Sequence, residues 1–539
     1  MKRRSILAAA LAAPVFGRLA APNIAAASGQ SVLKMIPSAN LTSVDPIFTT
    51  AYITRNHAFM IYDTLYGLNA ALEPQPQMAA GHTIDDDGLT VTIALRDGLT
   101  FHDGEKVRAT DAVASLRRWM KRSPFGQKLD AATHEVTALD DKRFRFRLKK
   151  RFPTLFDALA SVPNSSFVMP ERVAATDPYK QITETIGSGP FRFKRDEFNS
   201  GNLAVYERNP TYLPRSQGET SLTSGPKRVF FDRVEWHIVP DAATAGAALQ
   251  KGEVDWWEQP TPDLRPLLRA DKKLSVEAID RGGSQGILRL NHLQPPFDNR
   301  DLRRAILPAV NQADFMQAVV GTNPDDWHDG IGVFSRDTPM ANNAGMAAFT
   351  GPRDVDLAKK LMREAGYNGQ LMRTIGPTDY LAQTAETLVT VDLFKRLGFN
   401  QDAAISDWGT VVQRRTSREP LEKGGWSAMC LAPTSFDLLD PAVNGMVRGN
   451  GLAAFPGWPT SPKLEQLNDT WFDAPDVAGR KALAAEIQKV ALEEVTMIPL
   501  GWFKNFTALR RDLTDRVPGF AIFWGVRQGS GVVGLGFCV

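Results

Sequence analysis

Polar and apolar residues alternate along residues 90–95, which is the pattern of a strand with one buried face. Asp-Gly pairs follow at 97–98 and at 103–104, and Asp-Gly is typical of tight turns next to strands. A short stretch, residues 99–102, stands between these pairs. We therefore predict two strands joined by a turn, with a second turn after them.

A helix is predicted to begin at Thr110, after the second turn. The hydroxyl of Thr110 can accept a hydrogen bond from an early helical N–H, and Asp111 lies at the positive end of the helix dipole. Val113 and Leu116 stand three residues apart, so they lie on one face of this helix.

Further strands and helices follow along the chain, without a fixed repeat. Alternating or apolar runs predict strands at residues 142–151, 229–239 and 287–291. Helical spacing predicts helices at residues 242–249, ending near Gly252; 301–320, with a kink at Pro308; 355–365, stopped by Gly366; and 476–494. Mixed strands and helices favour α/β layers, in which ligands usually bind in crevices between lobes.

Residues 1–27 have the three parts of an export signal. These parts are a basic start at residues 2–4, an apolar run at residues 6–16 and a small-residue exit at residues 25–27. We expect cleavage after Ala27. The apolar run is too short to span a bilayer, so a permanent membrane anchor is the weaker alternative. Residues 3–7 also resemble a twin-arginine signal, and this route and the general secretory route both stay open.

Composition narrows the class of protein. With 539 residues, 43% hydrophobic and 23% charged, the chain can bury a large core and form more than one domain. The net charge of +3 is nearly balanced, which argues against nucleic acid as a partner. The two cysteines, Cys430 and Cys538, could form a bridge in an oxidising compartment, but a protein of this size does not need one.

One fragment raises the alternative of a secreted serine hydrolase. Residues 282–286 match G-x-S-x-G, the spacing that exposes a nucleophilic serine, here Ser284, on a turn between a strand and a helix. The residues that follow have a strand pattern instead of a helix pattern. The seven histidines are scattered, and neither H-E-x-x-H nor a phosphate-binding loop occurs. We therefore expect no enzyme, no cofactor and no metal site.

Residues 87–119 contain the order LR-DG-x-x-FHDG-E-x-x-x-A-T-DAV-x-S-x-R. This order closely resembles the block that marks the family 5 extracellular solute-binding proteins, the carriers of peptide, opine and nickel ABC importers. Six further motifs follow in the family's order. They are IGSGPF at 186–191, ERNPTY at 207–212, AALQKGEVD at 247–255, NHLQPPFD at 291–298, RRAI at 303–306, and AKKL with AGY at 358–367. The chain is identified as a member of this family.

The resemblance implies a two-lobed, periplasmic-binding-protein-like α/β fold of the large type, with three regions. The implied boundaries are 28–72, 187–288 and 501–539 for the first lobe, 73–186 for its inserted subdomain, and 289–500 for the second lobe. The chain would then cross between lobes near Asn291 and Leu500, and these crossings would act as hinges that close over the ligand.

The resemblance also implies a function. The chain would be the periplasmic substrate-binding component of an ABC importer, a monomer that captures a small peptide or an amino-acid-derived cationic solute in the cleft between lobes. It would deliver this solute to a permease with separate ATPase subunits. The same fold could instead carry an oligosaccharide or a nickel chelate, for which His292 and His328 are the available imidazoles.

Asp437 is the main candidate for ligand binding. Peptide-binding members of the family resemble one another in a W-x-GD-x-x-DP pattern, whose Asp accepts the ligand's ammonium group. Asp437 stands three residues before Asp440-Pro441, as that Asp does, although Phe436 replaces the Gly. A carboxylate in a closed cleft must be paired, which favours a cationic ligand group. The alternative is that Asp437 caps a turn or a helix.

Aromatic and polar side chains complete the set of candidates. Trp426, Trp408 and Tyr380 fall in the half whose loops face the cleft in the family, and a flat ring can cover an apolar or cationic part of a ligand. Asn291 and His292 stand at a predicted crossing between lobes. For His292 the alternative is a structural histidine.

Overall fold

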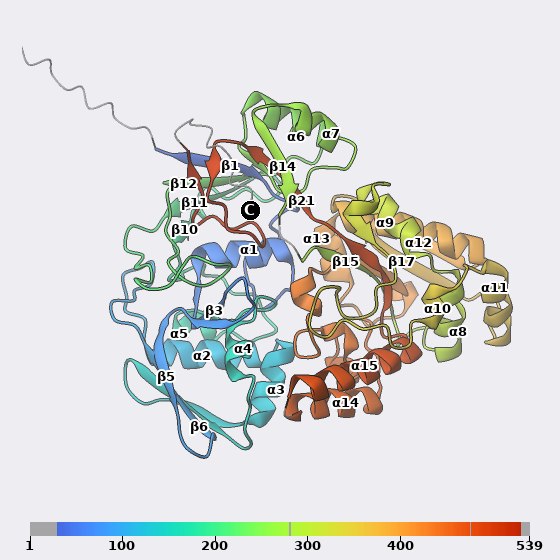
Figure 1. Ribbon diagram of the computed structural model, residues 1–539, viewed down its shortest axis with the longest axis horizontal. Helices are drawn as coiled ribbons and strands as arrows, with labels where there is room; N and C mark the ends of the chain where they lie inside the picture. Colours follow the sequence, from blue (N-terminus) through green and yellow to red (C-terminus); the bar gives the residue numbers. More distant parts are fainter. Residues whose placement is uncertain (1–29, 280–281, 475, 530–539) are drawn as a thin grey trace, which may run out of the picture.

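The structure is a computed structural model that describes residues 30–279, 282–474 and 476–529. The predicted export signal, its cleavage site and Cys538 lie outside these residues, and so does a bridge between Cys538 and the buried Cys430. Figure 1 shows two halves side by side, the left one holding the start of the described chain and the right one holding α8 to α12. In the part of the chain that is described, no helix has the length and apolar character needed to cross a membrane.

A seven-stranded sheet forms the upper part of the left half, in the order β10-β11-β12-β1-β13-β21-β14. The central strand β1 pairs in parallel with β12 and β13, and its Met35 lies opposite the fully buried Trp236 and Trp256. The strands are β1 (Val32–Ile36), β10 (Phe191–Phe193), β11 (Leu203–Arg208), β12 (Arg233–His237), β13 (Trp256–Trp257), β14 (Leu274–Ala278) and β21 (Phe506–Arg510). The helices packed beside it are α1 (Tyr52–Ile61), α6 (Ala242–Lys251) and α7 (Arg265–Ala270).

A smaller, antiparallel sheet lies below, in the order β5-β6-β8-β7. Along β8 the side chains alternate between buried and exposed, as the sequence predicts, and Phe144 and Phe146 face the core. The strands are β5 (Ala79–Ile84), β6 (Thr90–Leu95), β7 (Thr133–Ala138) and β8 (Arg143–Leu148). The nearby elements are α2 (Ala109–Met120), α3 (Pro124–Ala132), α4 (Leu155–Ala160), α5 (Glu171–Ala174) and the short pairs β2 (Asp63–Thr64) with β9 (Phe167–Val168) and β3 (Tyr66–Leu68) with β4 (Pro74–Pro76).

The right half is built on a six-stranded sheet in the order β16-β20-β15-β19-β17-β18. Its strands are β15 (Ser284–Leu290), β16 (Trp327–His328), β17 (Leu371–Pro377), β18 (Asn400–Ser406), β19 (Ala428–Leu431) and β20 (Ile498–Phe503). Its helices are α8 (Arg300–Ala305), α9 (Gln312–Val320), α10 (Ala347–Thr350), α11 (Val355–Glu364), α12 (Leu381–Leu397), α13 (Trp408–Arg414), α14 (Pro462–Asp473) and α15 (Val477–Glu494). The short 3-10 turns of this half are η1 (Leu307–Ala309), η2 (Pro324–Asp326), η3 (Leu421–Lys423), η4 (Ser435–Leu438), η5 (Gly445–Val447) and η6 (Gly451–Ala453). After the six-stranded sheet, β22 (Leu513–Thr514) pairs with β23 (Arg527–Gln528).

The chain passes between the two large sheets at two places. It leaves the seven-stranded sheet after Ala278 and enters the six-stranded sheet at Ser284, and it returns between Phe503 and Phe506. The crossings predicted near Asn291 and Leu500 are therefore displaced by several residues. The reason is that all of β15 is buried and pairs with β19 and β20, so its polar first residues already belong to the right half.

Several local predictions are confirmed with small shifts, and three are wrong. Thr110 does not cap α2, because the helix begins at Ala109 and the Asp111 carboxylate accepts from the N–H of the N-cap residue Arg108 at 2.8 Å. The stretch at residues 99–102 is no regular strand, since only a single bridge joins Thr100 to Lys106. The helix predicted at residues 301–320 is not kinked but divided into α8 and α9, because Pro308 lacks the N–H that a continuous helix needs. Each of the two helices then has its own asparagine cap, Asn299 and Asn311.

Candidate functional site

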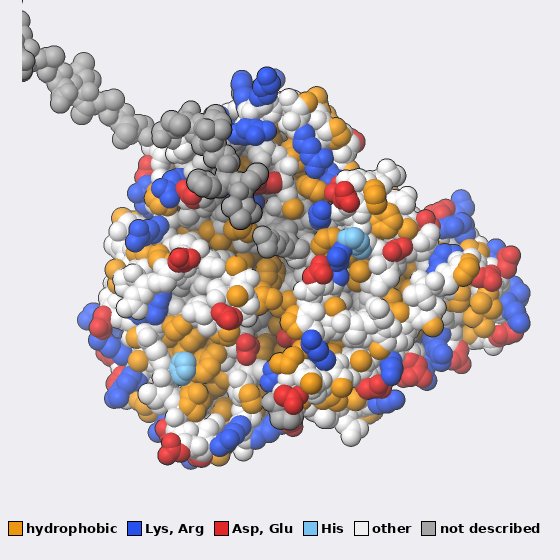
Figure 2. Space-filling view, in the orientation of Figure 1, with side chains coloured by type: hydrophobic (Ala, Val, Ile, Leu, Met, Phe, Trp, Pro, Cys, Tyr) orange, Lys and Arg blue, Asp and Glu red, His pale blue; other side chains and the backbone are white. Residues whose placement is uncertain are grey.

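A cavity of about 760 Å³ lies between the two halves of the molecule. The left half contributes residues 48–53, which lead into α1, and several residues between 121 and 127. The right half contributes Tyr380, Trp408 and much of the segment between 431 and 458. On the face seen in Figure 2, hydrophobic side chains gather along the line where the halves meet, while charged side chains dominate the outer rims. Both halves therefore form the wall of one cavity.

Asp437 lines this cavity on the short turn η4. Its Oδ2 accepts hydrogen bonds from the Tyr52 hydroxyl at 2.5 Å, the Thr434 hydroxyl at 2.6 Å and the Thr434 N–H at 3.1 Å. Burial, and then the charge of Asp437, raise the pKa of Tyr52 well above its ordinary value, so the phenol keeps its proton and donates. Asp437 thus caps its own turn, which is the alternative considered from the sequence. Its Oδ1 receives no hydrogen bond from the residues that the structure describes.

Tyr380 and Trp408 also line the cavity, and their ring centroids lie 5.0 Å apart. Asp379 accepts a hydrogen bond from the Trp408 N–H at 2.7 Å, and Asp407 caps α13 by accepting from the Thr410 N–H at 3.0 Å. These two carboxylates fix the start of α13, so the indole stands beside the phenol ring. The structure therefore brings three of the six predicted site residues, Asp437, Tyr380 and Trp408, to one cavity.

The other three predicted residues lie behind the wall of the cavity. Trp426 is fully buried and donates its indole N–H to the carbonyl of Arg415 at 3.1 Å. The Asn291 side chain donates to the Trp426 carbonyl at 2.8 Å. The Nε2 of His292 lies 3.1 Å from the Val495 carbonyl, and burial lowers the pKa of His292 well below its ordinary value, so the ring is neutral. Of these three contacts, only that of Trp426 reaches a residue of the cavity lining, Arg415.

Arginines that the sequence did not single out also line the cavity: Arg122, Arg415, Arg418 and Arg448. Arg415 is only 7% exposed, and its guanidinium donates to the Thr50 hydroxyl at 3.2 Å. Burial lowers the pKa of Arg415 to about 10. The chain has 63 Lys and Arg residues, and no spacing or motif marks these four among them.

A further arginine supports the wall without lining it. Arg289 on β15 is fully buried and donates to the carbonyls of Met446, Phe455 and Pro456 at 3.2, 3.1 and 2.9 Å, and also to that of Thr496. Burial lowers the pKa of Arg289 to about 9. Met446, Phe455 and Pro456 are all part of the cavity lining, so one guanidinium anchors this whole segment to the sheet.

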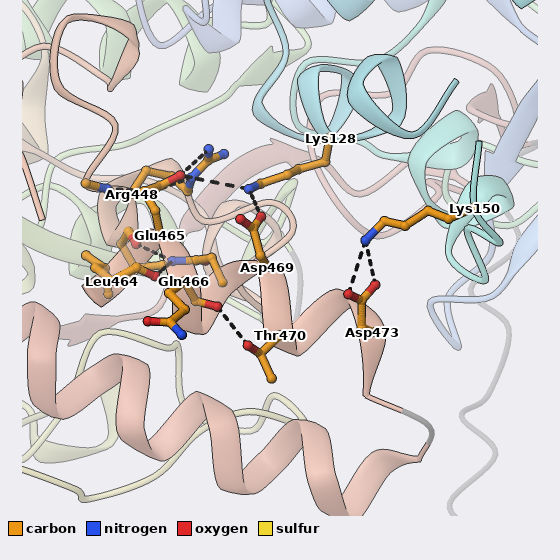
Figure 3. A network of polar contacts seen from close by, with 12 residues as sticks. Lys128, Lys150, Arg448, Leu464, Glu465, Gln466, Asp469, Thr470 and Asp473 are labelled. Atoms are coloured by element: carbon orange, nitrogen blue, oxygen red, sulfur yellow. Dashed lines mark hydrogen bonds and ion pairs between the residues drawn. The ribbon is translucent and has the colours of Figure 1, made fainter. Parts of the chain in front are cut away.

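Ion pairs join the two halves beside the cavity (Figure 3). Lys128 on α3 pairs with Asp469 on α14 and lies 3.9 Å from Glu465, and Lys150 pairs with Asp473 at 2.8 Å. Phe472 packs against Phe125 and Phe152 of the other half, with ring centroids 5.9 and 5.8 Å apart. Figure 1 places α3 and α14 in the lower part of the molecule, and β14 and β21, the strands next to the crossings, in its upper part. The halves are thus joined by contacts at the end opposite to the crossings.

The geometry offers no support for the hydrolase or for a metal site. Ser284 is the first residue of β15, three residues before the start that the sequence predicted, and its hydroxyl accepts from the Asn505 side chain at 2.9 Å. Within the described ranges, no group of three His, Cys, Asp or Glu side chains could hold a metal ion. Among the described residues that line the cavity, no histidine occurs, so neither His292 nor His328 is placed to meet a chelate there.

Comparisons with known proteins agree with this geometry. The chain is 35% identical over 492 residues to the "Probable peptide ABC transporter periplasmic-binding protein y4tO" of Sinorhizobium fredii, which covers 91% of this chain and 92% of that protein. It is 24% identical over 401 residues to the "Glutathione-binding protein GsiB" of Escherichia coli (strain K12), covering 72% of this chain and 73% of that protein.

A solved structure shares the fold. The binding protein AgaA from A. tumefacien R10, solved in complex with agropinic acid, superposes with a TM-score of 0.77 at 18% identity, over 93% of this chain and 99% of that one. The predicted two-lobed α/β fold is thereby confirmed. The family model described as "Bacterial extracellular solute-binding proteins, family 5 Middle" matches residues 73–441, which is more than half of the 539-residue chain. The chain therefore belongs to the bacterial extracellular solute-binding proteins of family 5, and not to a family of enzymes.

Proposed function

We propose that this chain is the periplasmic substrate-binding component of an ABC importer, and that it captures a small peptide or an amino-acid-derived solute between its two lobes. The observation that carries the proposal is the cavity of about 760 Å³ with walls from both halves. Its volume falls within the range of about 300–1,000 Å³ typical of small-molecule sites. The relative y4tO, named as a peptide ABC transporter binding protein, supports the same class of cargo.

Within this proposal, Asp437, Tyr380 and Trp408 contact the ligand. The free Oδ1 of Asp437 accepts from the ligand's ammonium group, and the paired rings of Tyr380 and Trp408 cover its apolar part. Trp426, Asn291 and His292 lie behind the wall of the cavity and bind backbone carbonyls there. The proposed site thus has three ligand-contacting residues from the six that the sequence suggested.

The boundaries between lobes follow the sheets. We place the second lobe between Ser284 and Phe503. The first lobe is formed by the segments before and after it, and residues 73–186 form the inserted subdomain of the first lobe. The two crossings act as hinges, and the protein works as a monomer that hands its ligand to a permease with separate ATPase subunits. Export by the twin-arginine route would deliver the folded chain to the periplasm.

Native mass spectrometry of the mature protein, purified gently from its own periplasm, tests the proposal. A small peptide or amino-acid derivative released in near-equal amount on unfolding is the expected result. Small-angle scattering with and without this compound tests the hinges, since closure lowers the radius of gyration. A protein that releases nothing, binds no peptide and turns over ester substrates instead would overturn the proposal.

A further inference from the structure

The charged side chains that line the cavity are unequal in number. Asp437 is the carboxylate among the described lining residues, and it stands against five cationic side chains: Lys121, Arg122, Arg415, Arg418 and Arg448. Two of the five are already neutralised, since Lys121 pairs with Asp130 at 2.7 Å and Arg448 pairs with Glu465 at 2.8 Å. The other three arginines have no ion pair within the described part of the chain.

Arg415 is the most deeply buried of these three arginines. Its guanidinium lies 5.7 Å from the Trp408 ring centroid and 5.5 Å from that of Phe455, and both rings line the cavity. A guanidinium has five N–H donors, yet the Thr50 hydroxyl is the one acceptor that it finds among the described residues. A buried cation without a counter-ion is unfavourable, and the depressed pKa of Arg415 reflects this. The remaining N–H donors of Arg415 are left for an acceptor in the cavity that it lines.

Arg122 and Arg418 line the cavity from different halves, and they are less buried than Arg415, since Arg122 is half-buried and Arg418 is exposed. Arg122 donates to the carbonyls of Phe48 at 2.9 Å and Ile47 at 3.4 Å and lies over the Tyr179 ring at 4.9 Å. Arg418 donates to the Leu452 carbonyl at 2.8 Å and lies over the Trp458 ring at 5.6 Å. Arg122 is thus held by a ring and two carbonyls and Arg418 by a ring and one carbonyl, and each has further donors left for an anion. Arg122 belongs to the left half and Arg418 to the right half.

We infer that the ligand carries at least two acidic groups in addition to its ammonium group, with one acidic group bound by Arg415 and the other by Arg122 or Arg418. This inference rests on the proposed function and narrows the ligand to acidic amino-acid derivatives or acidic small peptides. Planar carboxylates fit an arginine fork through two parallel hydrogen bonds, and a phosphate group would meet the same donors. An anion between Arg415 and Arg122 would also join the two lobes, so binding would favour closure.

Isothermal titration with four matched dipeptides tests the charge requirement. Ala-Glu, Ala-Gln and Ala-Lys differ in one side-chain charge, and Ala-Gln amide lacks the terminal carboxylate of Ala-Gln. Each charge-assisted contact contributes about tenfold or more in affinity, so Ala-Glu should bind at least about tenfold tighter than Ala-Gln, and Ala-Gln tighter than its amide. Equal or tighter binding of Ala-Lys would overturn the inference and leave the proposed function standing.

Native mass spectrometry separates the two levels of failure. A released compound with two or more acidic groups supports the inference, and one with fewer overturns it while confirming a binding protein. If no compound is released and none of the four dipeptides binds, the proposed function falls together with the inference.

The variant Arg415→Gln assigns the role to the residue, with Arg363→Gln on the exposed face of α11 as the matched control. Arg415→Gln should lower affinity for Ala-Glu by about ten- to a hundredfold and should shrink either the Ala-Glu to Ala-Gln ratio or the ratio of Ala-Gln to its amide. The melting temperature without ligand should hold or rise, since an unpaired buried cation has been removed. Both ratios unchanged, or a loss of stability without loss of selectivity, would assign Arg415 a structural role instead.

Discussion

The Tyr52 hydroxyl on α1 donates to the Asp437 carboxylate on η4 at 2.5 Å, although the two residues belong to different lobes and stand 385 positions apart. The same hydroxyl accepts from the Thr434 N–H at 2.8 Å. This pair of hydrogen bonds joins the lobes inside the cavity, next to the place proposed for the ligand's ammonium group. Closure therefore adds one hydrogen bond from the other lobe to a carboxylate that Thr434 already holds within its own turn.

Replacing Tyr52 by Phe should weaken ligand binding, because the closed state loses its hydrogen bond to a charged group. Such bonds contribute about 1.5–3 kcal/mol, so the dissociation constant should rise by about tenfold or more in isothermal titration. Tyr179→Phe is the control, since Tyr179 lines the same cavity and its hydroxyl has no hydrogen bond to another described residue. Equal effects of the two variants would show that the contact between Tyr52 and Asp437 does not support closure.

The ion pairs of Lys128 and Lys150 should hold the ligand-free lobes together. The double variant Lys128→Met with Lys150→Met should increase the radius of gyration of the ligand-free protein in small-angle scattering. Salt at 0.5 M should have the same effect on the wild type, because it shortens the screening length to about 4 Å and weakens these ion pairs. Each exposed pair contributes only about 0.2–1 kcal/mol, so the melting temperature should change little. Lys142→Met removes an exposed pair within one lobe, with Asp97, and should leave the scattering unchanged.

His57 should make the folded protein sensitive to acid. The ring is fully buried beside Phe193 and Tyr206, and burial lowers its pKa to about 3. In the unfolded chain a histidine takes up a proton below about pH 6.5, and the folded state cannot follow until about pH 3. Stability is therefore present above pH 6.5 and falls by about 1.4 kcal/mol per pH unit as the pH drops through this window.

The variant His57→Gln should lower the slope of the urea-unfolding free energy between pH 7 and pH 5 by about 1.4 kcal/mol per pH unit. The contributions of His102 and His292, whose pKa values burial also lowers, should remain. The exposed His134→Gln serves as the control and should keep the wild-type slope. A slope that stays the same in His57→Gln would show that another group governs the loss of stability in acid.

Glu386 should destabilise the fold as the pH rises. Both of its carboxyl oxygens are buried without a hydrogen-bond partner in the described structure, and burial raises its pKa well above the ordinary value. The unfolded chain releases this proton above about pH 4.3, while the folded state retains it, so stability declines by up to about 1.4 kcal/mol per pH unit until the folded pKa is reached. Glu386→Gln should be more stable than the wild type at pH 8 and nearly equal to it at pH 4 in urea unfolding. Glu422→Gln, at an exposed position, should not differ at either pH.

The sequence predicted those parts of the fold that depend on local pattern. The strand β6 has the predicted ends because its alternation is regular, and α6 ends at Gly252, whose φ of 76° suits a residue without a side chain. The start of β15 was missed because Ser284 and Gln285 are polar, and polar residues do not indicate a buried strand. Both are nevertheless buried, and the Gln285 amide donates to the carbonyl of Gly332, distant in sequence, at 2.7 Å. Such partners cannot be read from neighbouring residues.

The candidate site was predicted only in part for the same reason. Asp437 could be found by its distance from Asp440-Pro441, whereas Arg415 becomes visible only when Thr50, 365 positions away, and the rings of Trp408 and Phe455 meet around it. Trp426 stands close to Asp437 in sequence, but its side chain faces the core, where its N–H reaches a backbone carbonyl.

The four hydrogen bonds from Arg289 to backbone carbonyls affect the ligand specificity of the protein. A loop tied down at Met446, Phe455 and Pro456 before any solute arrives has little conformational freedom left to lose on binding. It also cannot reshape itself around a poorly fitting solute. Rigidity on this side of the cavity therefore favours a binding protein with high affinity for few solutes over one that accepts many different compounds.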